Sequence, residues 1–237
     1  MSENSNENLA GLTEAEAVVA KDPQSPHTWN EAAILLLQAG NYPKAIEYIS
    51  QAVRLDPEEA VNYWNRGRIL FELGRYEEAL ADYSAAIQIA PTAALYSSRS
   101  VVNLALGKDA AALGDLNDAL DLERTAENLL NRASFFTNKG MAVDALRDMT
   151  AVIELEPEKP NHYLARANLA FALARHYPEL YEVGVGDIQS ALDLDKEGAL
   201  GPSMRQLADQ FEAYLPASPN PAVSKRLIEL IRAKTHE

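Results

Sequence analysis

The side chains that most often carry metal or proton chemistry are few and scattered in this sequence. Its four histidines stand far apart, and no two have the four-residue spacing that places a pair of ligands on one helical face. They are His27, His162, His176 and His236. Cysteine is absent, which excludes a thiolate metal site, a thiol nucleophile and a disulfide framework. We therefore expect no metal site, no bound cofactor and no catalytic residue.

Two short segments resemble ligand-binding loops but fail on spacing. DLDKEG at 193–198 opens like a calcium loop, but the position of the bidentate glutamate holds Met204, and Pro202 falls inside the loop. VGVGD at 183–187 has the glycines of a phosphate-binding loop without a preceding strand or the remaining spacing. Neither segment changes the expectation that the chain is not an enzyme.

Composition and charge narrow the range of partners. The chain has 237 residues, 47% of them hydrophobic, and a formal net charge of −14. This charge disfavours nucleic acid, because that affinity depends on neutralising phosphates with Lys and Arg. No stretch approaches the roughly 18 consecutive apolar residues that a membrane span needs. The first residues, MSENSNENLAGL, lack the pattern of a secretory signal, so we expect a cytoplasmic protein.

The elements that position all side chains repeat along the chain. Gly40, Gly74, Gly107 and Gly140 are separated by 34, 33 and 33 residues. An alanine follows each glycine by five residues, and a proline follows three of them by seventeen. Apolar residues recur at helical spacing on both sides of each glycine. Each unit is therefore predicted to be two helices joined at a glycine that adopts a left-handed turn conformation.

The period, the turn glycine and the closing proline resemble the tetratricopeptide repeat family over about residues 26–195. The residues that carry the core pattern in the first unit are Trp29, Ala33, Gly40, Tyr42, Ala45, Ala52 and Pro57. The resemblance implies an all-α fold, a right-handed superhelical solenoid of antiparallel helix pairs with about five repeats and capping helices at both ends.

The expected organisation is one domain over 12–235 after a disordered tail at 1–11. A capping helix is expected at 12–22, and two more at 200–215 and 219–234. The five repeats are expected at 26–59, 60–92, 93–125, 126–159 and 160–198. The fifth repeat carries a five-residue insertion within 175–185, which is either a feature for a particular partner or a tolerated loop or helical turn.

Arginines on the apolar faces of the first helices have matching aspartates. Arg66 lies eight residues before Gly74, and Asp82 lies eight residues after it, which predicts an ion pair across the hairpin. The alternative is that each arginine reaches the aspartate of an adjacent repeat. The other pairs are Arg99 with Asp115, Arg132 with Asp148, and Arg166 with Asp187, while the first repeat has Ala32 and Tyr48 in these places.

The first helix of each repeat also carries a stripe of residues thirteen, ten, six, three and two positions before the turn glycine. This stripe lies on a different face from the arginines. In the family, the corresponding positions line the concave groove where peptides or partner helices bind. Here they hold many apolar side chains, which often marks a binding surface. The alternative is that these side chains pack against the neighbouring repeat. We call twelve of them the binding stripe: Asn30, Ile34, Leu37, Trp64, Arg68, Phe71, Val101, Leu130, Ser134, Leu164, Asn168 and Phe171.

The sequence thus predicts a scaffold or adaptor that binds a peptide or helical segment of another protein. Some family members bind carboxylate tails of chaperones through lysines and an arginine, but Asn30, Ser97 and Val101 occupy those places here. We therefore do not expect that clamp. The alternative function is a self-assembling scaffold that forms homo-oligomers through the C-terminal helices or the solenoid end, because Val223, Leu227, Ile228, Leu230 and Ile231 need cover.

Overall fold

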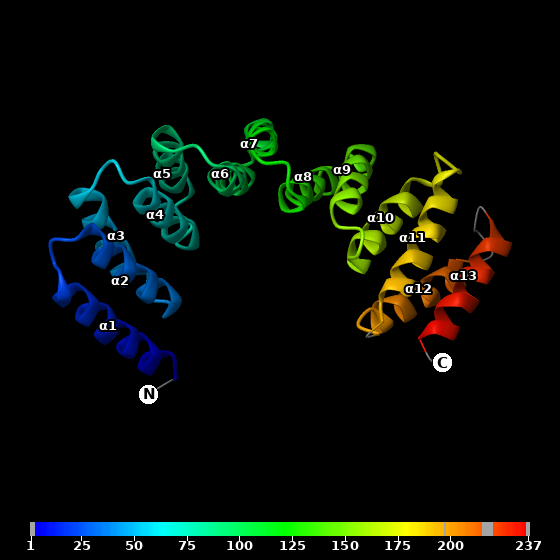
Figure 1. The fold of residues 1–237 in the computed structure, drawn as a ribbon, viewed down its shortest axis with the longest axis horizontal. Coiled ribbons are helices and arrows are strands. Elements are labelled where there is room, and N and C mark those ends of the chain that lie inside the picture. The colour runs from blue at the N-terminus through cyan, green and yellow to red at the C-terminus, as the bar shows by residue number, and fades with distance from the viewer. Residues whose placement is uncertain (1–2, 197, 215–219, 236–237) are drawn as a thin grey trace. The chain divides into compact units, whose positions relative to one another are not determined.

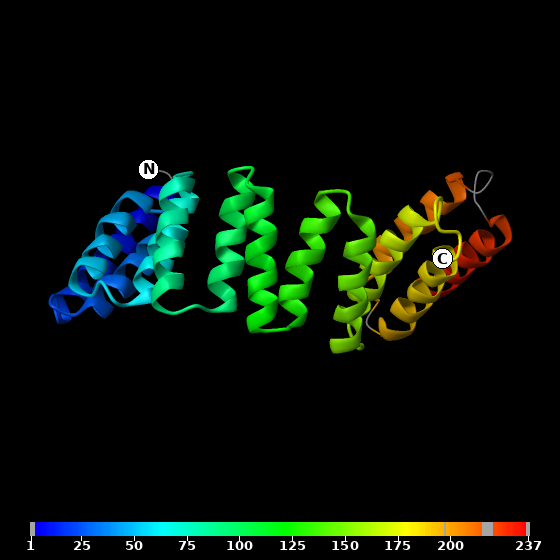
Figure 2. The same cartoon turned by 90° about the horizontal axis from the view of Figure 1, so that it is seen from above.

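The fold is all-helical, as predicted. The computed structural model describes residues 3–196, 198–214 and 220–235, and within them it has thirteen helices and no strand. Successive helices pack in pairs, and Figures 1 and 2 show the two members of each pair side by side. The chain divides into two compact units, Met1–Glu123 and Arg124–Glu237, where the sequence predicted one domain. Because a repeat packs only on its neighbours, a solenoid has no single central core.

The first unit holds the capping helix and three helix pairs. Consecutive helices pack against one another throughout this unit. The helices are α1 (Glu3–Lys21), α2 (Pro26–Gln38), α3 (Tyr42–Leu55), α4 (Ala60–Glu72), α5 (Tyr76–Ile89), α6 (Ala93–Ala105) and α7 (Asp109–Leu122).

The second unit holds two repeat pairs and a C-terminal pair. α9 packs on α10, and α13 packs on both α11 and α12. The helices are α8 (Ala126–Asn138), α9 (Ala142–Leu155), α10 (Pro160–Leu173), α11 (Leu180–Leu194), α12 (Gly201–Tyr214) and α13 (Pro221–Lys234).

The turn between the helices of a pair is closed by a glycine with positive φ, as predicted. Gly74 has φ +70°, a conformation in which a Cβ atom would be strained. Its N–H donates to the carbonyl of Phe71 at 2.9 Å, and the N–H of Arg75 donates to that of Leu70 at 2.9 Å. These bonds satisfy carbonyls that the end of α4 would otherwise leave unpaired. Gly40, Gly107 and Gly140 have φ +72°, +69° and +71°.

The N-terminal helix begins earlier than expected. α1 begins at Glu3, so residues 3–11 are helical where a disordered tail was expected, and residues 1–2 lie outside the described part. Extending an existing helix costs less than nucleating one, so a polar segment continues a helix whose later turns are packed. The C-terminal helices occupy Gly201–Tyr214 and Pro221–Lys234, close to the expected ranges.

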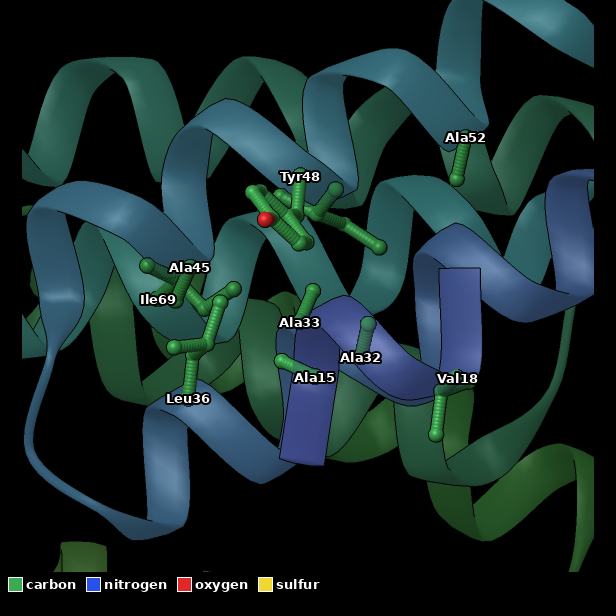
Figure 3. Packing of buried hydrophobic residues seen from close by; sticks show 10 residues of the cluster. Ala15, Val18, Ala32, Ala33, Leu36, Ala45, Tyr48, Ala52 and Ile69 are labelled. Atoms are coloured by element: carbon green, nitrogen blue, oxygen red, sulfur yellow. The ribbon is translucent and has the colours of Figure 1, made fainter. Parts of the chain in front are cut away.

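The first repeat has an apolar interior where later repeats carry charge. Ala32 and Tyr48 are buried beside Ala15 and Val18 of α1, and Figure 3 shows this cluster. The Trp29 and Tyr48 rings meet edge to face, with centroids 5.2 Å apart. The capping helix therefore contributes to the same core as the positions that hold arginine and aspartate elsewhere. This explains why both charges are absent from the first repeat.

Four later repeats carry the arginine–aspartate pair, and each pair lies within one hairpin, as predicted. Arg66 Nε and Nη2 donate to the two oxygens of Asp82 at 2.7 and 2.6 Å, which is bidentate geometry. This hydrogen bonding raises the pKa of the Arg66 guanidinium. The shortest nitrogen–oxygen distances are 2.6 Å for Arg99–Asp115, 2.7 Å for Arg132–Asp148 and 2.7 Å for Arg166–Asp187. The alternative pairing between repeats does not occur at these residues.

The insertion in the fifth repeat lengthens the connection between its helices. α10 ends at Leu173 and α11 begins at Leu180, so residues 174–179 replace the short glycine turn of earlier repeats. The Arg166–Asp187 pair keeps its geometry across this longer connection. The insertion is therefore absorbed at the end of the hairpin rather than within its packed length.

Candidate functional site

The binding stripe divides into an exposed row and half-buried rows. The exposed members all lie six residues before the turn glycine or at the equivalent place in the fifth repeat, and they are Arg68, Val101, Ser134 and Asn168. The half-buried members are Asn30, Ile34, Leu37, Trp64, Phe71, Leu130, Leu164 and Phe171. On a helix, positions on one side of a stripe face the neighbouring helix while the other side faces solvent. The exposed row is thus the part of the stripe that a partner can reach without rearrangement.

Asn30 is used inside the first unit. Its Nδ2 donates to Oδ1 of Asn62 at 2.9 Å, and its Oδ1 accepts from Nδ2 of Asn65 at 2.8 Å. Asn62 and Asn65 belong to α4 and are buried, so the network links α2 to α4. Both functional ends of the Asn30 amide are therefore occupied by the fold.

The aromatic members of the stripe also pack within their own units. Trp64 lies against the core cluster of the first unit, and its indole Nε1 donates to Oγ of Ser98 at 3.2 Å. The Phe71 ring lies 5.3 Å from the Tyr76 ring of α5. Phe171 lies 5.4 Å from Tyr181 of α11. Trp64 thus contacts the next repeat, while Phe71 and Phe171 pack on the second helix of their own repeat.

The exposed row carries the accessible apolar and charged groups of the stripe. Val101 is 49% exposed on α6. Val61 is 44% exposed on α4, where it lies thirteen residues before Gly74. Arg68 is exposed, and its Nη1 lies 3.4 Å from Oδ1 of Asn65. Arginine is enriched among interface hot spots, and exposed apolar side chains often mark a contact surface.

A pocket of about 280 Å³ in the second unit joins the stripe to the C-terminal pair. Leu164 and Asn168 of α10 line one side, and Ser203, Gln206 and Leu207 of α12 line the other. The structure thus brings two predicted residues together with three that the sequence did not suggest. These three residues could not be predicted from the repeat pattern, because α12 lies outside the repeats and has no turn glycine from which to count positions.

A second exposed apolar surface lies at the turn end of the second unit. Met141, Val143 and Tyr177 are 41%, 48% and 46% exposed and border a pocket of about 510 Å³. The residue after the turn glycine is Asn41, Arg75 or Lys108 in earlier repeats and methionine here. The methionine after Gly140 is thus a signal of this surface in the sequence, and Tyr177 comes from the insertion.

The described residues offer little that suggests chemistry. Among them, no group of three His, Asp or Glu side chains is close enough to hold a metal ion. Every buried side-chain nitrogen or oxygen in this part of the chain has a hydrogen-bond partner. None of the helices that the structure describes combines the length and apolar character needed to cross a membrane. What remains is a set of surfaces suited to non-covalent contact.

Comparison with known families agrees with this arrangement of helix pairs. The model of the tetratricopeptide repeat matches residues 4–60 and 30–94. The chain is a tetratricopeptide repeat protein. Proteins with these repeats mediate protein–protein interactions and are typically not enzymes.

Two curated proteins are similar to short parts of this repeat protein. The small glutamine-rich tetratricopeptide repeat-containing protein 2 of Mycosarcoma maydis is 32% identical over 71 residues, which cover 30% of this chain and 20% of that protein. A FAM10 family protein of Arabidopsis thaliana is 35% identical over 57 residues, which cover 24% of this chain and 13% of that protein. The similarity thus spans a fifth or less of each relative.

Solved structures share the fold over more of the chain. The C-terminal part of a tetratricopeptide repeat protein from Cytophaga hutchinsonii is 16% identical, with a TM-score of 0.76 over 97% of this chain and 92% of that one. YrrB, described as a tetratricopeptide repeat protein with an unusual peptide-binding site, is 21% identical, with a TM-score of 0.56 over 80% and 97% of the two chains. At these identities the likeness concerns the fold alone.

Proposed function

We propose that this chain is an interaction scaffold or adaptor that holds a peptide or helical segment of another protein against the binding stripe. The observation that carries the proposal is the exposed row, where Val101 on α6 presents an apolar side chain to solvent and Arg68 lies on α4, the first helix of the preceding repeat. Such groups act as an apolar anchor and a hydrogen-bond donor when a segment is laid across adjacent first helices. The described peptide-binding site of YrrB supports the same kind of partner.

The structure changes which residues should carry the contact. Trp64 and Phe71 are half-buried and packed on their own unit, so their removal would disturb the fold as well as any interface. Arg68, Val101, Ser134 and Asn168 are exposed and are the better test of binding. We infer that the half-buried rows shape the surface and that the exposed row makes the contacts.

A matched pair of substitutions tests this function. Val101 and Leu122 are 49% and 50% exposed in the first unit, but only Val101 belongs to the stripe. Each is replaced by Glu, and partners are captured from lysate and quantified by mass spectrometry. We expect Val101→Glu to lower recovery of the retained proteins about tenfold, which corresponds to about 1.4 kcal/mol, while Leu122→Glu retains them. Equal recovery by the Val101→Glu variant and the wild type would contradict the proposal.

The proposal includes three narrower statements. We infer that the chain has no catalytic role, that its partner is a protein rather than nucleic acid or membrane, and that it does not use the chaperone-tail clamp. The location that goes with this function is the cytoplasm, and imaging of a tagged chain tests that.

Self-assembly is the second candidate function, and it now rests on a different surface. The apolar residues of α13 are covered by the chain itself, since Leu227, Ile228 and Ile231 are 1%, 5% and 0% exposed. The patch of Met141, Val143 and Tyr177 is the exposed apolar surface that favours association. If it mediates self-assembly, the mass from light scattering rises with concentration, and Val143→Glu abolishes the rise while Leu155→Glu on the same helix does not. A wild-type mass that stays monomeric at all concentrations would contradict it.

A further inference from the structure

The face that α12 presents to the pocket between α10 and α12 is set by the packing of its opposite face in the core. Met204 and Ala208 of α12 are 0% and 1% exposed and lie in one core cluster with Ala167 and Ile188. Residues four apart on a helix share a face, so burying these two sets the rotation of α12 about its axis. That rotation leaves Ser203, Gln206 and Leu207 beside the stripe residues Leu164 and Asn168.

Three polar side chains among the described lining residues of this pocket are not used by the described part of the fold. Asn168, Ser203 and Gln206 have no hydrogen-bond partner among the described residues, and all three are exposed. Two amide groups and one hydroxyl can both donate and accept hydrogen bonds. The peptide group presents the same combination, one N–H donor and one C=O acceptor per residue. The pocket therefore matches the main chain of an extended segment.

The composition and size of the pocket restrict its ligand further. The described residues that line it carry no charge, so this part of the pocket offers no counterion to an acidic or basic side chain. Its volume of about 280 Å³ lies at the lower end of the roughly 300–1,000 Å³ of small-molecule pockets, so only a short part of a longer chain would lie within it. Leu164 and Leu207 provide apolar contact for one aliphatic side chain.

We propose that this pocket binds an uncharged, extended segment of another protein, whose peptide groups pair with Asn168, Ser203 and Gln206 and whose aliphatic side chain lies between Leu164 and Leu207. The inference rests on the proposed function and deepens it, because it gives the ligand class of one end of the stripe. It also gives the C-terminal helix α12 a role in recognition beyond covering the last repeat.

Blocked synthetic peptides test the proposal on the whole 237-residue chain. The probe is a fluorescent nine-residue peptide with a central Leu among Gly and Ser, acetylated and amidated at its ends. Two further probes replace the central Leu with Asp or Lys. We expect saturable binding of the Leu peptide, with a Kd at least about tenfold lower than those of the charged peptides. No saturable binding of the Leu peptide up to about 1 mM, or equal affinity for all three, would overturn the proposal.

Substitutions locate the binding in the pocket. Asn168→Ala and Gln206→Ala are each expected to raise the Kd of the Leu peptide about fivefold to tenfold. Gln88→Ala is the matched control, since Gln88 is an exposed helical glutamine of α5 outside the pocket. The same Kd for Gln206→Ala and Gln88→Ala contradicts the site, as does a second copy of the chain occupying it, seen as self-association that Gln206→Ala abolishes.

Failure of this inference is distinguishable from failure of the proposed function. If Val101→Glu lowers capture of partners while Gln206→Ala leaves peptide affinity unchanged, the pocket is not the peptide site and the stripe still binds proteins. If Val101→Glu leaves capture unchanged, the function itself fails, whatever the peptides do.

Discussion

Asn30 and Asn168 lie on the same stripe of the repeat, in different compact units, and they are in opposite situations. Asn30 donates to Asn62 and accepts from Asn65, so its amide is fully engaged in linking α2 to α4. Asn168 is exposed and has no hydrogen-bond partner among the residues that the structure describes. Asn30 lies in a half-buried row of the stripe and Asn168 in the exposed row, so membership of the stripe alone does not decide whether a polar side chain is available. What decides it is whether the fold already uses its polar atoms.

The arginine–aspartate pairs extend this comparison to charged groups. They look like candidate sites in the sequence, but the pairs satisfy each other inside the hairpins, and the aspartates of the first unit have side chains only 8% and 4% exposed. The described lining residues of the pocket between α10 and α12 carry no charge, yet their polar side chains make no hydrogen bond to other described residues. Availability of hydrogen-bonding atoms, rather than charge, separates the binding candidates from the architecture in this molecule.

The largest effect on stability should come from removing the aspartate of one arginine–aspartate pair. Asp115 accepts from Arg99 and also from Asn103 Nδ2 at 2.8 Å, so Asp115→Ala removes the acceptor of Arg99 Nε and Nη2 and of the buried Asn103 amide, while Arg99 Nη1 keeps Ser84 Oγ. We expect the free energy of unfolding in urea to fall by roughly 3–5 kcal/mol. The control is Asp118→Ala, an exposed aspartate on the same helix, for which the change should stay within about 0.5 kcal/mol. Equal midpoints for the two variants would mean that the pair does not hold the hairpin.

A direct comparison of the two asparagines should give the next largest effect. Asn30→Ala removes a partner from both Asn62 and Asn65, which are 1% and 7% exposed. Leaving buried polar groups unsatisfied costs about 1–3 kcal/mol, so this variant should melt earlier than Asn168→Ala in the same denaturant titration. If both variants unfold at the same urea concentration, the network around Asn30 does not stabilise the fold. The proposed difference between Asn30 and Asn168 would then be wrong.

Much of this outcome follows from the sequence, because a repeat supplies its own internal controls. The glycines at a 33-residue or 34-residue spacing predict the helix pairs, and arginines and aspartates at equal distances from Gly74 predict a contact across one hairpin. Both are local consequences of one turn. The Asn30–Asn62–Asn65 network links two repeats, and its geometry depends on how α2 and α4 pack, which spacing along the chain does not determine.

Two other features were beyond the reach of the repeat pattern for the same reason. The pocket residues Ser203, Gln206 and Leu207 belong to a helix without a turn glycine to count from, so their face is set by the burial of Met204. The helical state of residues 3–11 depends on continuation of α1, whose later part packs on α2, rather than on the polar composition of the segment itself.

A smaller effect is expected at Trp64, the stripe residue that combines packing with a hydrogen bond. Ser98→Ala removes the acceptor of the indole N–H and should lower the free energy of unfolding by about 1 kcal/mol. Ser203→Ala is the matched control, because its hydroxyl has no partner among the described residues, and its unfolding should be unchanged. If Ser98→Ala instead weakens partner capture at unchanged stability, Trp64 contributes to partner binding rather than to the stability of the fold.

The smallest effect on stability is expected where the largest effect on binding is proposed. Asn168 and Gln206 make no hydrogen bond with described residues, so replacing both by Ala breaks no hydrogen bond within the described part of the chain. The free energy of unfolding should therefore change by no more than about 0.5 kcal/mol, and circular dichroism in urea measures it. In the same preparation, the affinity for the blocked Leu peptide should fall by more than the larger of the two single effects, since both amides face one ligand. A double variant that unfolds early would show that these amides are already engaged, and the difference between Asn30 and Asn168 would disappear.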